Sequence, residues 1–420
     1  NLIRQYVYQR PLKKIFASKS LQLVSFTITE KGYALRDAKG EYFPFIRSDI
    51  DNGPDKASSA MAVVSALLYE RFNTCKAPLA VVSMDNCSHN GEKLRNSITD
   101  MVGEWQKKGF VSEDFVQYVN DENTISFPWS MIDKITPRPA DTVAESLKEA
   151  GVEDMDPVIT SKRTYIAPFV NAEGPQYLVI EDRFPNGRPQ LEKAGVYMTD
   201  RDTVNKVERM KVTTCLNPLH TALAVYGCVL GYDLIADEMK DKELSELVKR
   251  IGLVEGMPVV TNPGIIDPEK FADEVINVRI PNPFMPDTPQ RIATDTSQKV
   301  GIRYGETIKS YVAKDGSARA LTAIPLAIAG WCRYLLGIDD NGEAFELSPD
   351  PMADELKCQL DGIVWGELSS YTGQLKNLLS NANIFGINLY EAGIGDKIEE
   401  MFVEEISGKG AIRETLKKYL

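Results

Sequence analysis

The sequence predicts an α/β domain over residues 1–205, followed by a mainly α-helical domain over residues 206–420. The chain has 420 residues, more than one ordinary hydrophobic core accommodates, so two domains are expected. Between residues 21 and 139, strand-like and helix-like patterns alternate at the spacing of a parallel sheet with crossover helices. Beyond about residue 206, apolar side chains recur mainly at helical spacing.

The first predicted element is LQLVSFTITEKGYAL (21–35), which alternates, is rich in β-branched residues and reaches Gly32. It predicts a strand that enters a loop. The continuous apolar run at 77–87 predicts a strand covered on both faces. The predicted order is strand 21–35, helix 56–72, strand 77–87, helix 90–109 and a proline-punctuated strand at 124–139. Residues 140–205 are less regular, and their Pro and Gly turns predict hairpin-like pieces such as 177–190.

The second domain is predicted from helical spacing of apolar residues. Its predicted helices are 218–236, 241–251, 267–275, 300–312, 318–336, 350–360, 368–382 and 394–418. The two most hydrophobic stretches, 221–236 and 320–338, are short or are interrupted by Pro325 and Arg333. They predict buried helices, and no membrane span is expected.

Composition limits the class of partner. A net charge of −12 argues against nucleic acid and against an anionic membrane surface, because both need a cationic face. The six cysteines are scattered, with no CxxC pair and no metal-ligand spacing. They predict reduced thiols in a cytoplasmic protein, without a bound metal.

A polar cluster of Lys211, Asn217 and His220 opens an otherwise apolar stretch, ERMKVTTCLNPLHTALAVYG (208–227). His220 is one of only two histidines in the chain. Asn217 and Pro218 are typical of an N-cap and a first helical residue, which places His220 in the first turn. The positive end of the helix dipole favours a neutral imidazole and a nearby alkoxide there. Taken alone, these residues are better explained as an ordinary helix cap, a core histidine and a solvated lysine.

One expected motif is missing from the first domain. A nucleotide-binding α/β domain normally has a Gly-rich turn after its first strand, but nothing before Gly32 provides one and no GxGxxG occurs elsewhere. Either the domain binds no dinucleotide, or its first strands precede this sequence.

The stretch FPWSMIDKITP (127–137) resembles the signature of the polyol-specific long-chain dehydrogenases, the family of mannitol 2-dehydrogenase and fructuronate reductase. Its core reads Ile-Asp-Lys-Ile-Thr-Pro over 132–137, with conservative departures at Ile132 and Lys134. Further blocks resemble the family in the same order along the chain: SFTITEKGY, VVSMDNCSHNGEKLR, VIEDRFPNGRPQLEKAGV, ERMKVTTCLNPLHTALA, RIATDTSQK and AGWCRYL. The resemblance implies a Rossmann-like dinucleotide-binding domain whose first strands are absent from this chain.

The resemblance also implies roles for individual residues. Lys211 matches the catalytic base, while Asn217, His220 and Asn86 match residues that hold the reacting oxygen. Asn86 also matches a cofactor contact. The remaining matches are Asp133 and, more weakly, Glu30 at the cofactor, and Arg291 and Lys299 at the substrate. This chemistry needs a base and oriented donors but no metal.

The spacing between Lys211 and Asn217 departs from the family, being six positions where the family has five. On an unbroken helix, Lys211 and His220 would lie on opposite faces. We therefore expect residues 211–217 to be kinked, bulged or non-helical, and a one-residue π-bulge would restore the family register.

The implied activity is an NAD-linked interconversion of a secondary alcohol of a linear polyol or aldonate and its ketone. The favoured pair is D-mannonate and D-fructuronate, because the NPLH version of the cluster is closer to bacterial uronate-pathway relatives. The alternatives are a mannitol 2-dehydrogenase or another hexuronate reductase, and, in a different class, a binding or scaffold protein that has lost turnover. NADP stays open, because the segment that selects the cofactor is absent. A monomer or small homo-oligomer is expected.

Overall fold

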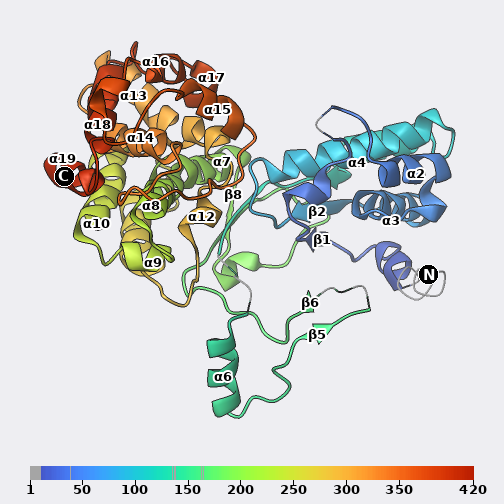
Figure 1. Cartoon of the computed structure of the whole chain (residues 1–420). Coiled ribbons are helices and arrows are strands. Elements are labelled where there is room, and N and C mark those ends of the chain that lie inside the picture. The colour runs from blue at the N-terminus through green and yellow to red at the C-terminus, as the bar shows by residue number, and fades with distance from the viewer. Residues whose placement is uncertain (1–10, 38, 135, 137–138, 162, 164) are drawn as a thin grey trace. The chain divides into compact units, whose positions relative to one another are not determined.

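The computed structural model describes residues 11–37, 39–134, 136, 139–161, 163 and 165–420 (Figure 1). The chain divides into two compact units. The first consists of Asn1–Lys134 and Gln176–Glu208, and the second of Ile135–Pro175 and Arg209–Leu420. The first unit is α/β and the second is mainly helical, so the predicted fold class is confirmed.

A parallel sheet forms the centre of the first unit. Its strands are β1 (Leu23–Phe26), β2 (Leu79–Ser83) and β3 (Ile125–Ser126), in the order β1-β2-β3. All five residues of β2 are buried, as its continuous apolar run predicted. The accompanying helices are α2 (Pro44–Asn52), α3 (Ala60–Thr74), α4 (Asn90–Lys107) and α5 (Glu113–Asn120). Their apolar faces supply much of the main core, in which Trp105 and Phe115 are fully buried.

The predicted strand 124–139 is two strands in two different sheets. After β3, Phe127–Pro128–Trp129 interrupts the pairing, and β4 (Ser130–Asp133) then joins a second sheet. There β4 pairs antiparallel with β7 (Tyr177–Glu181), which pairs parallel with β8 (Tyr197–Thr199). Pro128 has no backbone N–H, so it cannot continue a ladder through this point. Ile135 and Pro137 of the signature stretch lie outside the described residues.

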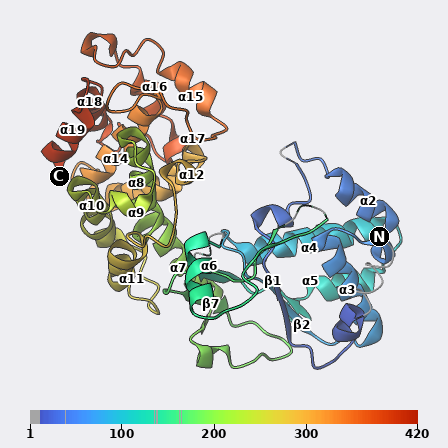
Figure 2. The ribbon, with the colours of Figure 1, turned by 60° about the horizontal axis from the view of Figure 1, so that its bottom comes forward.

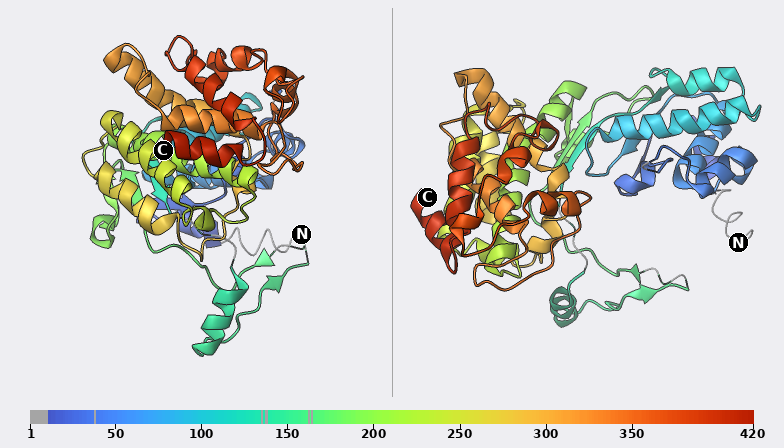
Figure 3. Two further views of the ribbon diagram at one scale, coloured as in Figure 1. Left: turned by 60° about the vertical axis from the view of Figure 1, so that its left-hand side comes forward. Right: turned by 45° about the horizontal axis from the view of Figure 1, so that its top comes forward.

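The prediction of a hairpin at 177–190 was wrong. Only its first part is a strand, β7, and its partners are β4 and β8. Pro185 and Pro189 in the remainder lack the N–H groups that a returning strand needs. A hairpin does occur earlier, where β5 (Val158–Ile159) pairs antiparallel with β6 (Tyr165–Ile166), the teal arrows of Figure 3. It follows helix α6 (Asp141–Glu149).

Helices dominate the second unit, as Figure 2 shows. Helix α7 (Arg201–Met210) leads into it. The α-helices that follow are α8 (Asn217–Leu230), α9 (Ile235–Glu238), α10 (Lys242–Lys249), α11 (Pro268–Glu274), α12 (Pro289–Ile292), α13 (Glu306–Asp315), α14 (Ala323–Tyr334), α15 (Ala353–Gln359), α16 (Leu375–Leu379), α17 (Ala382–Phe385), α18 (Gly395–Glu405) and α19 (Ala411–Tyr419). The predicted helix 394–418 is two helices, because Gly408 and Gly410 have positive φ angles between them.

The core of the second unit is built around α14, every residue of which is buried. It packs against α8 and α18. Gly330 permits the close approach to α8, since a Cβ there would lie 2.5 Å from Cζ of Tyr226. The Tyr226 hydroxyl lies 2.8 Å from the Leu326 carbonyl and donates to the Glu405 carboxyl at 2.6 Å. This core fixes α8, which carries Asn217 and His220.

No helix among the described residues is both long and apolar enough to cross a membrane. The six cysteines, all of which lie in described parts of the chain, form no disulfide.

Candidate active site

Lys211–Cys215 forms a π-helical turn, η4, between α7 and α8. The Leu216 N–H donates to the Lys211 carbonyl at 3.1 Å, the five-residue hydrogen bond that defines such a turn. Leu216 then leaves the helical conformation, with φ −134° and ψ −62°, and α8 begins at Asn217. The predicted bulge between Lys211 and Asn217 is therefore confirmed.

The π-helical turn is held by its surroundings within the second unit. The Thr307 hydroxyl donates to the Thr213 carbonyl, within the turn, at 3.2 Å. Gly256 approaches so closely that a Cβ on it would lie 2.7 Å from the Thr214 methyl group. Lys211, the first residue of this turn, is only 3% exposed and is therefore shielded from bulk water.

Asn217 is not the N-cap that the sequence predicted. The N-cap is Leu216, which makes no side-chain capping bond, and Asn217 is the first helical residue with Pro218 behind it. The shift by one position follows from the π-helical turn, because the non-helical residue that ends it is Leu216. Asn217 and His220 are partly exposed, whereas Pro218 and Leu219 between them are buried. The two polar side chains are thus the accessible ones in this turn.

Arg291 and Lys299, the predicted substrate-binding pair, differ in their surroundings. Arg291 on α12 is exposed, and its guanidinium is held by Asp287, with Nε at 2.5 Å from the carboxylate. Lys299 is partly buried and donates to the Thr294 carbonyl at 2.6 Å. Burial lowers the pKa of Lys299, and the neighbouring Arg303 lowers it further. The structure therefore leaves Arg291 at the surface in an ion pair and encloses Lys299 more closely, near Arg303.

A second π-helical turn, η9 (Gly301–Gly305), follows Lys299 and contacts both η4 and α8. Two close approaches hold it against α17. A Cβ on Gly301 would lie 2.6 Å from the Ile384 carbonyl oxygen, and one on Gly305 only 1.9 Å from that of Phe385. From this turn Arg303 reaches α8, where its Nη1 donates to the Thr221 hydroxyl at 2.5 Å. Sequence analysis missed Arg303; the available signal was its position one helical turn after Lys299.

In the first unit, Asn86 is exposed directly beyond the carboxyl end of β2, the usual ligand-binding edge of a parallel sheet. Its neighbour Asp85, which sequence analysis also missed, is buried and organises the loop after β1. The Asp85 carboxylate accepts from the N–H groups of Ile28, at 3.0 and 3.1 Å, and Thr29, at 2.7 Å, and from the Tyr33 hydroxyl. These bonds hold Thr29 at a positive φ of 63°.

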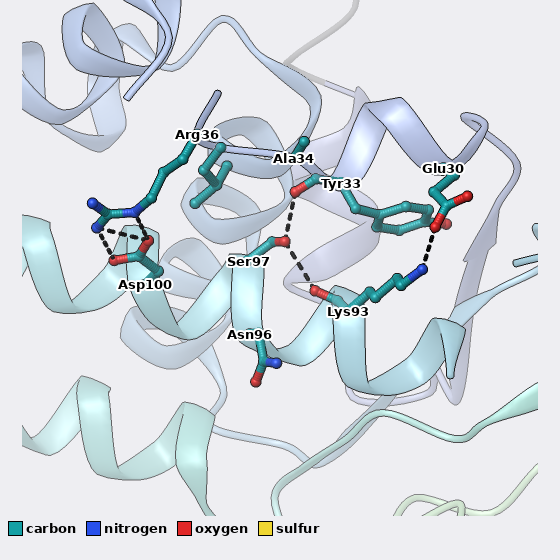
Figure 4. Close-up of a pocket in the computed structure, with 9 residues that line it drawn as sticks. Glu30, Tyr33, Ala34, Arg36, Lys93, Asn96, Ser97 and Asp100 are labelled. Atoms are coloured by element: carbon teal, nitrogen blue, oxygen red, sulfur yellow. Dashed lines mark hydrogen bonds and ion pairs between the residues drawn. The ribbon is translucent and has the colours of Figure 1, made fainter. Parts of the chain in front are cut away.

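Glu30, the weaker cofactor candidate, is exposed and forms an ion pair with Lys93. Both residues line a cavity of about 400 Å³ in the first unit, drawn in Figure 4. Arg36 and Asp100, also in its lining, are paired with each other at 3.3 Å. The charged groups Glu30, Lys93, Arg36 and Asp100 are thus matched in two pairs, and no member of the Lys211 cluster lines the cavity.

Asp133 ends β4 and is 2% exposed. His89, which sequence analysis left outside the catalytic set, precedes α4 in a left-handed conformation and packs against Trp129 with ring centroids 4.5 Å apart. Its ring Nε2 lies 3.3 Å from the Asn205 side-chain oxygen, and its backbone N–H donates to the Glu208 carboxylate at 3.4 Å. These contacts account for His89 as a structural residue of the first unit.

Within the described residues, no group of three or more His, Cys, Asp or Glu side chains is arranged to hold a metal ion. The polar groups of the Lys211 cluster are an amine, an amide and an imidazole. Such a set can accept a proton and donate hydrogen bonds to a developing alkoxide.

Two protein-family models together match nearly the whole chain. Residues 12–193 match the mannitol dehydrogenase Rossmann domain, and residues 203–405 match the mannitol dehydrogenase C-terminal domain. Among curated proteins, a D-mannonate oxidoreductase of Thermotoga maritima is 56% identical over 409 residues, which is 97% of this chain and 75% of that protein.

Two solved structures are similar in fold and sequence. A mannitol 2-dehydrogenase of Pseudomonas fluorescens, in a ternary complex with NAD and D-mannitol, matches with a TM-score of 0.66 and 25% identity. The match covers 98% of this chain and 77% of the other. A D-sorbitol dehydrogenase in substrate-free form matches with a TM-score of 0.74 and 26% identity, over 96% of this chain and 78% of the other.

Proposed function

The chain belongs to the mannitol dehydrogenase family, and we propose that it interconverts D-mannonate and D-fructuronate with NAD as hydride carrier. At the coarser level it is an NAD-dependent polyol or aldonate dehydrogenase, because both family domains are present. The single observation that favours an aldonate is the 56% identity to a D-mannonate oxidoreductase.

Lys211 is the proposed base. In the oxidation direction, its neutral amine takes the proton of the substrate hydroxyl as the carbon–oxygen double bond forms, and the ammonium returns that proton to the oxygen in the reduction. Lys211 is buried, so a proton exchanged with the substrate hydroxyl is kept away from bulk water. The π-helical turn supports the assignment, because an unbroken helix would place Lys211 and His220 on opposite faces.

Asn217 and His220 are the proposed donors to the reacting oxygen. Both lie at the start of α8, where the helix dipole favours negative charge, and both are accessible. Donors that are already oriented stabilise a developing alkoxide without reorganisation during the reaction, which is a large term in enzyme catalysis.

The first unit offers groups that fit a dinucleotide. The exposed amide of Asn86 and the carboxylate of Glu30 both follow strands of the parallel sheet at their carboxyl ends, and together they can donate to and accept from ribose hydroxyls. Asp133 stays a third cofactor candidate. When bound, the nicotinamide supplies hydride chemistry; the residues of this chain supply binding and proton transfer.

The test is steady-state oxidation of D-mannonate and reduction of D-fructuronate by the full-length protein, beside mannitol and fructose. We expect the uronate pair to be preferred. Lys211→Ala and His220→Ala should each lower kcat by about 100-fold or more, the usual contribution of a proton-transfer group. Lys309→Gln is the matched control, because Lys309 is a surface lysine of α13 that pairs with Glu306.

The outcomes separate the alternatives. A preference for mannitol and fructose would replace the uronate assignment by a mannitol 2-dehydrogenase. Full turnover in both the Lys211 and His220 variants would refute the assignment of the base and the donor. Cofactor binding without turnover of any of the four compounds would favour a binding or scaffold protein.

A further inference from the structure

Arg303 contacts the first part of α8, the helix that carries the predicted site residues Asn217 and His220. Its guanidinium donates to the hydroxyl of Thr221, the residue after His220. The same hydroxyl donates to the Asn217 carbonyl at 2.8 Å. The next residue, Tyr304, donates from its hydroxyl to the Pro218 carbonyl at 3.0 Å, which fixes η9 against the first turn of α8. The side chain of Arg303 is therefore held beside the start of α8.

Arg303 is partly buried, and its bonding differs from that of the buried arginines Arg71, Arg333 and Arg279. Arg71 donates to five backbone carbonyls, and Arg333 to three. Arg279 forms a two-pronged ion pair with Glu173, in which both side chains are 1% exposed. In the described part of the chain, the guanidinium of Arg303 has one hydrogen bond, to Thr221, and no carboxylate partner. Four of its five N–H groups are therefore available.

The surroundings of Arg303 are short of negative charge. Burial lowers the pKa of Arg303 to about 10, and among the residues that the structure describes only the phenol of Tyr304 acts on it in the opposite direction. Lys299, one turn earlier, is a second cation. Asp350, near Lys299, is already bound by the N–H and hydroxyl of Ser297, at 2.8 and 2.5 Å. Arg303 is partly buried, so its guanidinium loses part of its hydration without gaining a carboxylate partner, and an anionic ligand offsets that loss.

We propose that Arg303 is the carboxylate anchor of the substrate site and makes it select aldonates and hexuronates over neutral polyols and ketoses. This inference rests on the proposed function, since it names the group that recognises the acid end of the substrate. A planar guanidinium can bind a carboxylate through two parallel hydrogen bonds, which gives orientation as well as affinity. Arg291 is less suited, because Asp287 already occupies its fork.

The test compares Arg303→Gln with wild type on an acidic and a neutral substrate of the same chain length. We expect kcat/KM for D-fructuronate to fall by about 100-fold, as for other buried charge partners, and that for D-fructose to change by less than about 3-fold. Arg303→Lys keeps the positive charge but cannot form two parallel hydrogen bonds to a carboxylate. Its kcat/KM for D-fructuronate should lie between those of the wild type and Arg303→Gln. Arg319→Gln, an exposed arginine of the same unit, is the matched control.

A binding measurement keeps the inference testable without turnover. D-mannonate should raise the thermal unfolding midpoint of the wild type but not that of Arg303→Gln. D-mannitol should change the unfolding midpoint of the two proteins by the same amount. Without ligand, Arg303→Gln should unfold at the same temperature as wild type or higher, because it removes a partly buried charge that has no carboxylate partner among the described residues.

The result patterns are distinct. Equal losses on both ketoses, or a clearly lower unfolding midpoint without ligand, would assign Arg303 a structural role and overturn the inference. An unchanged preference for the acid would overturn it as well. If D-mannonate is bound through Arg303 but neither oxidised nor formed, the anchor stands and the proposed function fails. If neither binding nor turnover occurs, both fail.

Discussion

Glu405 on α18 is a buried carboxyl whose ionisation should make the protein less stable as the pH rises. The side chain is 0% exposed; one oxygen accepts from Tyr226, and the other has no hydrogen-bond partner in the described residues. Burial raises the pKa of Glu405 to about 8, although the nearby Arg333 opposes the shift. Replacement by Gln keeps an acceptor for Tyr226 and removes the titration.

The sign and size of the effect follow from the two pKa values. Below about pH 4.5 the carboxyl is protonated in both the folded and unfolded states and contributes no pH dependence. Between pH 4.5 and 8 the unfolded chain releases the proton while the folded protein retains it, so stability falls by about 1.4 kcal/mol per pH unit. Over about 3.5 units the loss approaches about 5 kcal/mol, and above pH 8 it is constant.

The assay is urea denaturation of wild type and Glu405→Gln at half-unit steps from pH 5 to 9, with the difference in unfolding free energy plotted against pH. We expect the variant to gain on the wild type up to about pH 8 and the gap to stay constant beyond. Glu404→Gln is the matched control, because Glu404 is next in the chain but 28% exposed and paired with Lys418. A flat difference for Glu405→Gln would refute the argument from burial.

Two further predictions concern local structure. Asp85→Asn should destabilise the first unit by about 2 kcal/mol, because it replaces a carboxylate that accepts from two backbone N–H groups. The control Asp37→Asn, in an exposed turn, should cost much less. Equal thermal unfolding midpoints of the two variants would contradict this prediction. Gly305→Ala should lower stability by about 2 kcal/mol, because its Cβ would meet the Phe385 carbonyl oxygen, whereas Gly103→Ala in the open middle of α4 should raise it by about 0.5 kcal/mol. A Gly305→Ala protein as stable as wild type would show that η9 can move.

Periodicity and spacing in the sequence carried the fold class and the main elements. The buried strand β2, the amphipathic helix α4 and the helical character beyond residue 206 all depend on neighbours within one or two turns, so they are encoded locally. The same holds for the π-helical turn. The spacing of six positions between Lys211 and Asn217 predicted a bulge, and the chain has a π-helical turn at Lys211–Cys215.

Local patterns in the sequence could not show which distant segment each strand or side chain contacts. That β7 pairs with β4 and β8 instead of folding back on itself depends on strands brought from elsewhere in the chain. Asp85 reaches back 57 residues to Ile28, and Arg303 reaches back 82 residues to Thr221. The sequence by itself determined which local structures form and which family they match. Only the tertiary structure decided which charges meet a partner, because burial and pairing are properties of the packed chain.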